Sequence, residues 1–315
     1  MLASLSYPPV PIFEIGPLQM SLHGLFAGVG FVVGALLMLR EARRRGYDED
    51  AITSVLTWAL VGAILGARLF TVPAHLGDPG YGFDDVVNPA GFYSIMGGFA
   101  GGILVGLARI RMIGMASLPH LDMAAFGLAI GTVVGRIGDI FIVEHLGGPT
   151  SFFLGYELKP GYDVAPQHDA LETLCETTGQ CGPYHHAALY DLLGAAVLLG
   201  VLYLVQSRWA GRLRYGMLFT LWVAWYGFQR FLIDFTRNTE DFFASLPTGI
   251  GAGGADATLG PFTWSQWSGL ALGLLATGVL VWLARAKPTD VVTPSNDRER
   301  GADPPGLQPA GEAVE

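Results

Sequence analysis

Charged residues are scarce in this chain of 315 residues, and that scarcity excludes an ordinary soluble domain. Asp, Glu, Lys and Arg make up only 14% of the residues, whereas a soluble globular domain has about 25%. The hydrophobic share is 51%, and the mean hydropathy is +0.43. Apolar stretches long enough to cross a bilayer recur along most of the chain, which predicts an all-α, polytopic membrane protein.

The chain also lacks a basic patch that would suit nucleic acid, so we expect no nucleic-acid partner. No basic segment precedes the first apolar run, as it would in a secretory signal peptide, and we expect that run to be retained as a membrane helix. Part of the net charge of −9 comes from a tail rich in Pro, Gly and Asp, and another acidic cluster lies between Glu144 and Glu176. We therefore expect a transmembrane domain over residues 1–287 and a disordered acidic cytoplasmic tail over residues 288–315.

Cysteine is nearly absent. Cys175 and Cys181 both fall in the long segment after the fourth apolar run. An oxidising compartment would allow a disulfide between them, and two free thiols in a loop are an equally good interpretation. The sequence contains no metal-ligand cluster, nucleophile triad or phosphate-binding P-loop, so we expect no metal and no cofactor.

Seven apolar segments, most of them near the ~20 residues that a crossing helix needs, predict seven transmembrane helices. The segments are Ile15–Leu39, Ala51–Thr71, Phe92–Leu107, Leu118–Val143, His186–Val205, Tyr215–Phe235 and Phe262–Ala284. Basic residues follow every odd-numbered segment, which predicts an N-terminus outside and a C-terminus in the cytoplasm. Glycines spaced four apart, such as Gly62 and Gly66, predict close packing between helices.

Four arginines stand apart from these cytoplasmic clusters, at the outward ends of the second, fourth and sixth segments. They are Arg68, Arg136, Arg230 and Arg237. An arginine within a span costs about 2.5–3.5 kcal/mol on insertion scales. In one interpretation each side chain reaches the interface and pairs with Asp139, Glu144 or Asp234. In the other interpretation, their planar guanidinium groups bind a lipid headgroup phosphate in the outer leaflet. The gathering of four arginines on one face favours this second interpretation.

Two local motifs support the phosphate interpretation. The glycines in Gly135-Arg136-Ile137-Gly138-Asp139 allow close backbone approach beside a charge. The i, i+4 spacing places Arg230 and Asp234 on one helix face, where the acid can orient the arginine toward a ligand. A purely structural salt bridge between these two residues is the alternative.

From about Ile15 to Ala284, the order and spacing of these motifs resemble the prolipoprotein diacylglyceryl transferase family. The similar elements are Ile15-Gly16-Pro17, Leu65-Gly66-Ala67-Arg68, Gly135-Arg136-x-Gly138 with Glu144 and Gly147, His185 with Leu189-Tyr190-Asp191, Tyr226-Gly227 with Arg230, Asp234 and Arg237, and Ser265-Gln266-Trp267-Ser268. The resemblance implies an enzyme of the bacterial plasma membrane with its active site toward the outer leaflet. Such an enzyme moves the diacylglyceryl group of phosphatidylglycerol onto the lipobox cysteine thiol of a prolipoprotein, and glycerol phosphate leaves.

The resemblance also implies roles for individual residues. Arg136 would hold the phospholipid and Arg230 the leaving phosphate, with Glu144 as the orienting group. The expected catalytic residues are His185, Arg230, Tyr226 and Glu144. The expected phospholipid-binding residues are Arg136, Arg68, Arg237, Gly138, Asp139, Asp234, Gly97 and Gly98.

Departures from the family pattern fall on the residues that handle protons. Met96 stands where the family has a histidine, and Asp139 replaces its signature asparagine. Three further departures are Ser21-x-His23 for His-x-Tyr, His186-Ala187-Ala188 for Pro-Ser-Gln, and Asp234 for a glutamate. A histidine near pKa 6.5 can act as a general base, and motif position favours His185 over the other candidates. The other candidates are His186, His23 and His145.

The same departures leave a second function open. A non-catalytic paralogue that binds an anionic lipid or a lipoprotein precursor would keep the arginines and lose the base, as this sequence does. A transporter or channel is less well supported, because the predicted charges gather at one depth and do not line a path across the bilayer.

Overall fold

The computed structural model describes residues 4–10, 13–15, 18–72, 82–87, 94–143, 145–162, 169–209, 212–237 and 258–286. These residues form two compact units. The first unit draws on Met1–Leu36 and Ala124–Val291, and the second on Leu37–Met123. The predicted tail, residues 288–315, lies outside the described residues. Most of the described chain is helical, which confirms the predicted all-α class.

Six helices in the described part of the chain are long and apolar enough to cross a membrane. They are α1 (Leu22–Arg45), α2 (Glu49–Leu69), α5 (Ile95–Met112), α6 (Ser117–Phe141), α8 (Ala187–Trp209) and α11 (Trp264–Arg285). Their surfaces expose large apolar side chains, among them Leu275 (71% exposed) and Leu65 (56% exposed). Such surfaces suit lipid better than water. The remaining predicted span coincides with α9 (Met217–Ile233), whose 17 residues continue into the 3-10 helix η2 (Asp234–Thr236).

The first membrane helix begins later than the sequence predicts. The predicted span starts at Ile15, whereas α1 starts at Leu22. Before it, the strands β1 (Phe13–Ile15) and β2 (Leu18–Met20) pair in antiparallel fashion. Pro17 lies between the strands in sequence, and a proline lacks the N–H that a helix interior needs. Apolar character alone therefore overestimates the length of this helix.

Glycines bring α2 and α5 of the second unit into backbone contact. A Cβ added at Gly62 would lie 2.5 Å from the carbonyl oxygen of Gly101 and 2.6 Å from the Cβ of Val105. Gly66 and Gly97 approach each other in the same way one turn along. Without a hydrophobic driving force between helices in lipid, such close packing supplies the attraction between them. The predicted glycine packing faces are confirmed for this pair of helices.

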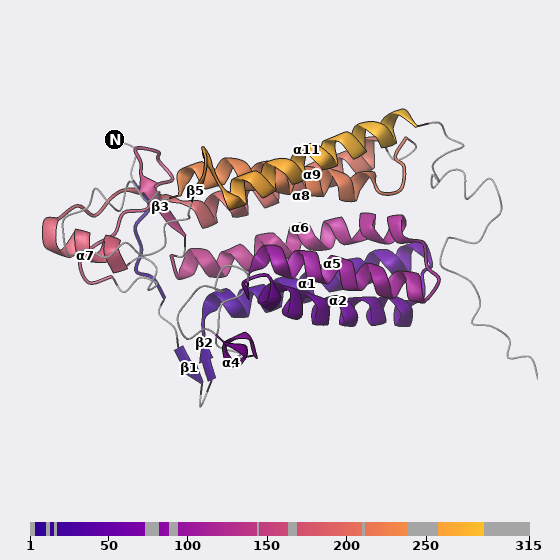
Figure 1. Ribbon diagram of the computed structural model, residues 1–315, viewed down its shortest axis with the longest axis horizontal. Coiled ribbons are helices and arrows are strands. Elements are labelled where there is room, and N and C mark those ends of the chain that lie inside the picture. The colour runs from indigo at the N-terminus through magenta and orange to yellow at the C-terminus, as the bar shows by residue number, and fades with distance from the viewer. Residues whose placement is uncertain are drawn as a thin grey trace, which may run out of the picture. The chain divides into compact units, whose positions relative to one another are not determined.

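In the first unit, α9 lies against both α8 and α11 (Figure 1). Gly227 of α9 faces Gly269 and Gly273 of α11 at distances that leave no room for a side chain. Helices α1 and α6 approach through Gly30 against Gly131 and through Gly34 against Gly127. Small residues at these crossings let the helices come close enough for polar side chains on neighbouring helices to meet.

A small non-membrane cap (residues 143, 145–162 and 169–186) lies between α6 and α8 in sequence. It contains β3 (Leu146–Pro149), α7 (Asp169–Thr178) and β4 (Tyr184–His186), and β3 pairs antiparallel with β4. Tyr156 bridges to β4 on one side and to Leu5 near the N-terminus on the other. Figure 1 shows β3 at the N-terminal end of α8.

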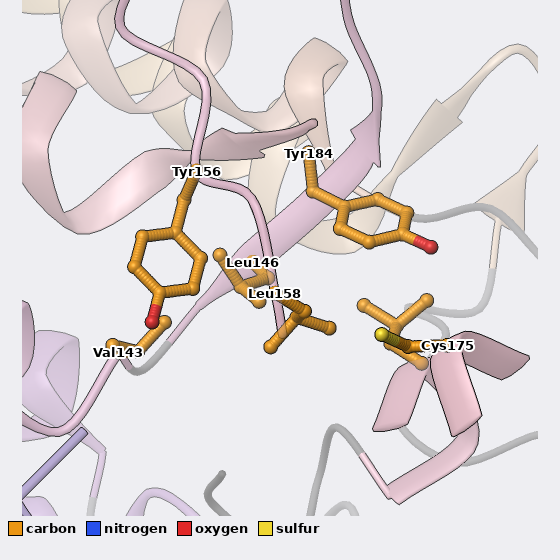
Figure 2. Close-up of a cluster of buried hydrophobic side chains, with 7 residues drawn as sticks. Val143, Leu146, Tyr156, Leu158, Cys175 and Tyr184 are labelled. Atoms are coloured by element: carbon orange, nitrogen blue, oxygen red, sulfur yellow. The ribbon is translucent and has the colours of Figure 1, made fainter. Parts of the chain in front are cut away.

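The cap has a hydrophobic core of its own, shown in Figure 2. Seven buried side chains form it: Val143, Leu146, Tyr156, Leu158, Leu171, Cys175 and Tyr184. Cys175 is joined to Cys181 by a disulfide, which decides between the two interpretations of this cysteine pair. Because β3 follows α6 and β4 leads into α8, this core holds the C-terminal end of α6 and the N-terminal end of α8 in place.

We expect Gly62→Ala to lower the stability of the protein. The new methyl group would overlap the backbone of Gly101, and overpacking of this kind costs about 1–3 kcal/mol. The measurement is the thermal unfolding midpoint of the purified protein in detergent. Gly28→Ala is the matched control, because a Cβ there meets no atom within 4 Å. An unchanged midpoint for Gly62→Ala would contradict the glycine contact between α2 and α5.

We expect Leu171→Ala to loosen the cap. Leu171 is fully buried in the cap core, and truncating a buried leucine costs about 2–5 kcal/mol. Limited proteolysis should then cleave within residues 143–186 faster than in the unaltered protein. Phe152→Ala removes a large side chain from the cap surface, where it is 45% exposed, and should leave cleavage unchanged. Equal cleavage of both variants would show that Leu171 does not support the cap.

Candidate functional site

Arg136 lies in the first unit near the C-terminal end of α6, inside a predicted span and 9% exposed. Its guanidinium group meets two carboxylates. One nitrogen donates to Oδ2 of Asp139 at 2.5 Å, and the other lies 2.8 Å from Oδ2 of Asp191 on α8. The two acids offset the cost of burying the arginine charge and tie α6 to α8.

Asp139 carries a second partner on α1. Its Oδ1 is hydrogen-bonded to Nδ1 of His23, while its own side chain is only 1% exposed. The contact depends on Gly138, because a Cβ at that position would collide with the carbonyl group of Leu22 and with Phe26. Gly138, predicted as a lipid-binding residue, thus has a clear role in bringing α1 and α6 together.

Asp191 is fixed from the other side by α9. The side-chain amide of Gln229 donates to Oδ1 of Asp191 at 3.2 Å and to its backbone carbonyl at 3.1 Å. Trp225 in turn donates its indole N–H to the Gln229 amide oxygen at 2.8 Å. A continuous chain of polar contacts therefore runs from α1 through α6 and α8 to α9. We call His23, Asp139, Arg136 and Asp191 the Arg136 cluster.

A second group of charges surrounds Asp234, at the end of α9. The carboxylate oxygen Oδ1 lies 3.1 Å from Arg230 and 3.5 Å from Arg237, and Oδ2 accepts a hydrogen bond from Thr263 at 2.5 Å. The Nε–H of Arg230 donates to the hydroxyl of Ser265 on α11 at 2.6 Å. We call Arg230, Asp234 and Arg237 the Asp234 cluster.

The two clusters differ in charge. Arg136, Asp139 and Asp191 sum to −1, and a proton on His23 would bring the total to zero. Arg230, Asp234 and Arg237 sum to +1. Since planar guanidinium groups match the geometry of phosphate oxygens, the Asp234 cluster is the better phosphate ligand of the two.

Two side chains connect the clusters. The hydroxyl of Tyr226 interacts electrostatically with Arg136 and Asp191 of one cluster and with Arg230 of the other. His145 interacts electrostatically with Asp139, and its Nδ1 lies 3.4 Å from Arg237. The expected catalytic residue Tyr226 thus interacts with both Arg136 and Arg230, to which the family resemblance gives the lipid and its leaving group.

The chain is strained where it leaves α6 toward the cap. Val143 and His145 have positive φ angles of 54° and 64°, a region that a β-branched residue such as valine rarely adopts. Gly147 packs directly against the backbone of Thr236, where a Cβ would clash. Because Gly147 packs against Thr236, His145 lies at the end of α9, beside Arg237. Glu144, the predicted orienting residue, lies outside the described residues.

The predicted base His185 lies on β4, and its Nδ1 is 3.1 Å from the hydroxyl of Tyr190. Burial lowers the pKa of the His185 imidazole. Its neighbour His186 is fully buried, with Nε2 at 2.9 Å from the hydroxyl of Tyr7. Burial lowers the pKa of His186 to about 4, although the charge of Asp139 acts in the opposite direction. His186 is therefore neutral at physiological pH.

Three predicted lipid-binding residues belong to the second unit and are described there by themselves. The Nε–H of Arg68 donates to the carbonyl of Val86 in the short helix α4 (Phe83–Val87) at 2.9 Å. Gly97 approaches the backbone of Gly66, and Gly98 lies 3.6 Å from Ala67, measured from an added Cβ. Both glycines belong to the first turns of α5, which Ser94 caps by accepting from the Gly97 N–H at 3.3 Å.

Four residues were not predicted as site residues: Asp191, which belongs to the Arg136 cluster, and Gln229, Thr263 and Ser265, which hydrogen-bond to members of the two clusters. Asp191 appeared in the family motif Leu189-Tyr190-Asp191, but its spacing gave no sign that it pairs with Arg136, 55 positions away. One signal could have identified Asp191 as a site residue: it is a carboxylate near the start of an apolar helix, and such a charge needs a partner inside the membrane.

The family model described as "Prolipoprotein diacylglyceryl transferase" matches residues 10–282. The phosphatidylglycerol–prolipoprotein diacylglyceryl transferase of Frankia alni is 29% identical over 253 residues, which are 79% of this chain and 63% of the relative. The protein of that name from Thermoanaerobacter sp. (strain X514) is 35% identical over 147 residues, which are 45% of this chain and 56% of the relative.

A third relative of the same name, from Leifsonia xyli subsp. xyli, is 27% identical over 257 residues, which are 78% of this chain and 73% of the relative. The chain thus spans less than two thirds of the first two relatives. The family match nevertheless extends from before α1 almost to the end of α11. The chain, a multi-pass membrane protein of bacterial type, belongs to the prolipoprotein diacylglyceryl transferase family.

Proposed function

We propose that this protein transfers the diacylglyceryl group of phosphatidylglycerol to the lipobox cysteine thiol of a prolipoprotein. In this reaction the cysteine sulfur forms a bond to the terminal glyceryl carbon. The bond between that carbon and the phosphate oxygen breaks, and its electrons leave with glycerol phosphate. The thiol proton passes to a base. Relatives named for this reaction support the proposal, because the family match covers both charged clusters.

The observation that carries the proposal is the Asp234 cluster, in which two arginines share one carboxylate. The leaving phosphate gains a negative charge as the carbon–oxygen bond breaks. Donors held in position before the reaction stabilise such a charge without reorganising. Asp234 and Ser265 hold Arg230 in this way, and Thr263 holds Asp234.

We propose a different role for Arg136 than for Arg230. Its guanidinium group already meets Asp139 and Asp191, so a lipid phosphate would have to share it with two anions. We therefore assign the phosphate first to Arg230 and Arg237, while Arg136 joins α6 to α8 beside them. Contacts of Arg68, Gly97 and Gly98 with the lipid stay predictions.

The proposed site faces the outer leaflet of the plasma membrane. Basic residues such as Arg43 and Arg109 end α1 and α5, and the positive-inside rule supports a cytoplasmic location for those ends. The ends of α6 and α9 that carry both clusters are then external. A thiol in a secreted preprotein would reach them there, and an acceptor thiol on the substrate removes the need for a nucleophile in the enzyme.

A non-catalytic lipid-binding paralogue is the second candidate. By the family resemblance, Met96 stands where a histidine is expected, and methionine cannot accept a proton. Arg136 is already paired with two carboxylates. Such a protein would bind phosphatidylglycerol through the Asp234 cluster without transferring any part of it.

Turnover by the purified full-length protein separates the two functions. The protein is placed in vesicles that contain phosphatidylglycerol, a lipobox peptide is added, and mass spectrometry follows the gain of one diacylglyceryl group per peptide. We expect product from the unaltered protein. Vesicle binding without any product, even at high protein concentration, would support the paralogue and overturn the transferase.

We expect Arg230→Ala to reduce the rate constant for transfer by about 10²–10³-fold, the usual loss when one donor to a developing anion is removed. Arg230→Lys should restore only part of the rate, because lysine keeps the charge but lacks the planar fork. Arg208→Ala is the matched control, since Arg208 is an exposed arginine in the last turn of α8, at the other end of that helix from Asp191. Equal rates for Arg230→Ala and Arg208→Ala would exclude Arg230 from the chemistry.

A further inference from the structure

We propose that two phenylalanines of the cap insert into the membrane surface and hold the cap against the bilayer. Phe152 and Phe153 belong to residues 150–154, which we call the Phe152 loop, and they are 45% and 46% exposed. Two adjacent aromatic rings at the tip of an exposed loop are a poor surface for water and mark a site of interaction. The partner that the structure favours is the lipid leaflet on the side of the cap.

The Phe152 loop has a fixed conformation that presents these rings. The N–H of Phe152 donates to the hydroxyl of Thr150 at 3.1 Å, and the N–H of Gly155 donates to the carbonyl of Phe152 at 2.8 Å. The N–H of Thr150 donates to the carbonyl of Pro183 at 2.8 Å, which ties the loop to the segment before β4. The ring centroids of Phe152 and Phe153 lie 4.7 Å apart. Because hydrogen bonds hold the backbone, the exposure of the two rings is a property of the folded loop.

Helix α8 has a stripe of exposed apolar side chains that meets lipid. Leu193, Val197 and Leu204 are exposed, whereas Leu198 and Leu202 are buried. The spacing of the exposed three places them on one face of the helix, and the buried two lie on the opposite face. Because α8 is long and apolar enough to cross a membrane, its exposed apolar face suits the lipid chains.

Tyr190 joins this stripe to the Phe152 loop. It lies one turn before Leu193, on the same face of α8 and close to the start of the helix. The ring of Phe152 packs edge-on against the ring of Tyr190, with 5.9 Å between the centroids. The apolar surface of α8 therefore continues onto the cap through an aromatic contact.

The position of Tyr190 along α8 also fits the membrane surface. At a rise of 1.5 Å per residue, Tyr190 and the exposed Trp209 lie roughly 30 Å apart, which is about the thickness of the hydrocarbon core. Aromatic side chains at both ends of a span are typical of the two membrane–water interfaces. Tyr190 then lies at the interface on the side of the cap, and the Phe152 loop packs on it at the same level.

Insertion of the loop would also fix the depth of β4. The ring of Tyr190 contacts His185 of β4, with 5.8 Å between the centroids, as well as Phe152. A cap held by its phenylalanines would therefore keep His185 at the level of the lipid headgroups. An apolar segment of a peptide substrate is the other partner that such a loop could bind. The continuity with the lipid-facing stripe of α8 favours the membrane.

The test uses a single introduced cysteine. Cys175 and Cys181, the two cysteines of the sequence, are joined in a disulfide, so without reductant a thiol-reactive fluorophore labels only an added thiol. Ser151→Cys places the label beside both phenylalanines and leaves them intact. The labelled full-length protein is placed in phosphatidylcholine vesicles. We expect a shift of the emission to the blue and loss of emission when the vesicles contain lipids with a spin label near the headgroup.

Thr177→Cys is the matched control. Thr177 is an exposed residue of α7, and Figure 1 shows α7 on the side of the cap away from the membrane helices of the first unit. Its label should lose emission to a water-soluble quencher and keep it with the spin-labelled lipid.

A third protein combines Ser151→Cys with Phe152→Ser and Phe153→Ser. It should lose the quenching by lipid, which would show that the phenylalanines and not the fluorophore cause insertion. Its thermal unfolding midpoint in detergent should equal that of Ser151→Cys alone, because both phenylalanines lie on the surface of the cap.

Three results would overturn the proposal. The first is equal behaviour of the labels at positions 151 and 177, whether both reach lipid or both reach water. The second is quenching by lipid that survives both serine substitutions. The third is quenching or a blue shift that appears at position 151 only after a lipobox peptide is added, which would assign the loop to the peptide. The vesicles contain no phosphatidylglycerol, so the result does not depend on the proposed transfer.

Discussion

Charges inside a membrane span must be compensated where they stand, and this constraint organises the first unit. An arginine at a helix centre costs about 2.5–3.5 kcal/mol on insertion scales, and an uncompensated buried acid is costly as well. Arg136 meets this requirement with Asp139 and Asp191, and Asp234 meets it with Arg230 and Arg237. The first solution joins α6 to α8 and, through His23, to α1. The second lies within one segment at the end of α9, and Ser265 and Thr263 connect it to the start of α11.

The glycines and the charges depend on one another. Gly138 lets α1 approach α6 so closely that His23 can reach Asp139, and Gly147 lets the cap approach the end of α9. A larger side chain at either position would separate groups that interact over less than 4 Å. The cap adds a hydrophobic core outside the membrane, and this core anchors β3 and β4 at the ends of α6 and α8. Two features therefore hold the charged clusters in position: the close backbone packing at the glycines and the separate hydrophobic core of the cap.

Two charged clusters with opposite net charge suit a reaction that moves a proton and releases a phosphate. The Asp234 cluster has the positive charge that a departing phosphate needs, and the Arg136 cluster has a negative charge that a proton on His23 neutralises. Tyr226 and His145 interact with both clusters.

The sequence by itself determined the class of fold, the apolar spans, the glycine packing faces and the four unusual arginines, because hydropathy and spacing are local properties of a chain. The family motifs also identified Tyr226 and the i, i+4 pair of Arg230 and Asp234. Only the tertiary structure decided which acid pairs with which arginine, that Asp191 joins the Arg136 cluster, that Ser265 holds Arg230, and that β1 and β2 precede α1. These contacts join residues up to 116 positions apart on different helices. Their formation depends on how the helices pack, and no spacing along one helix contains that information.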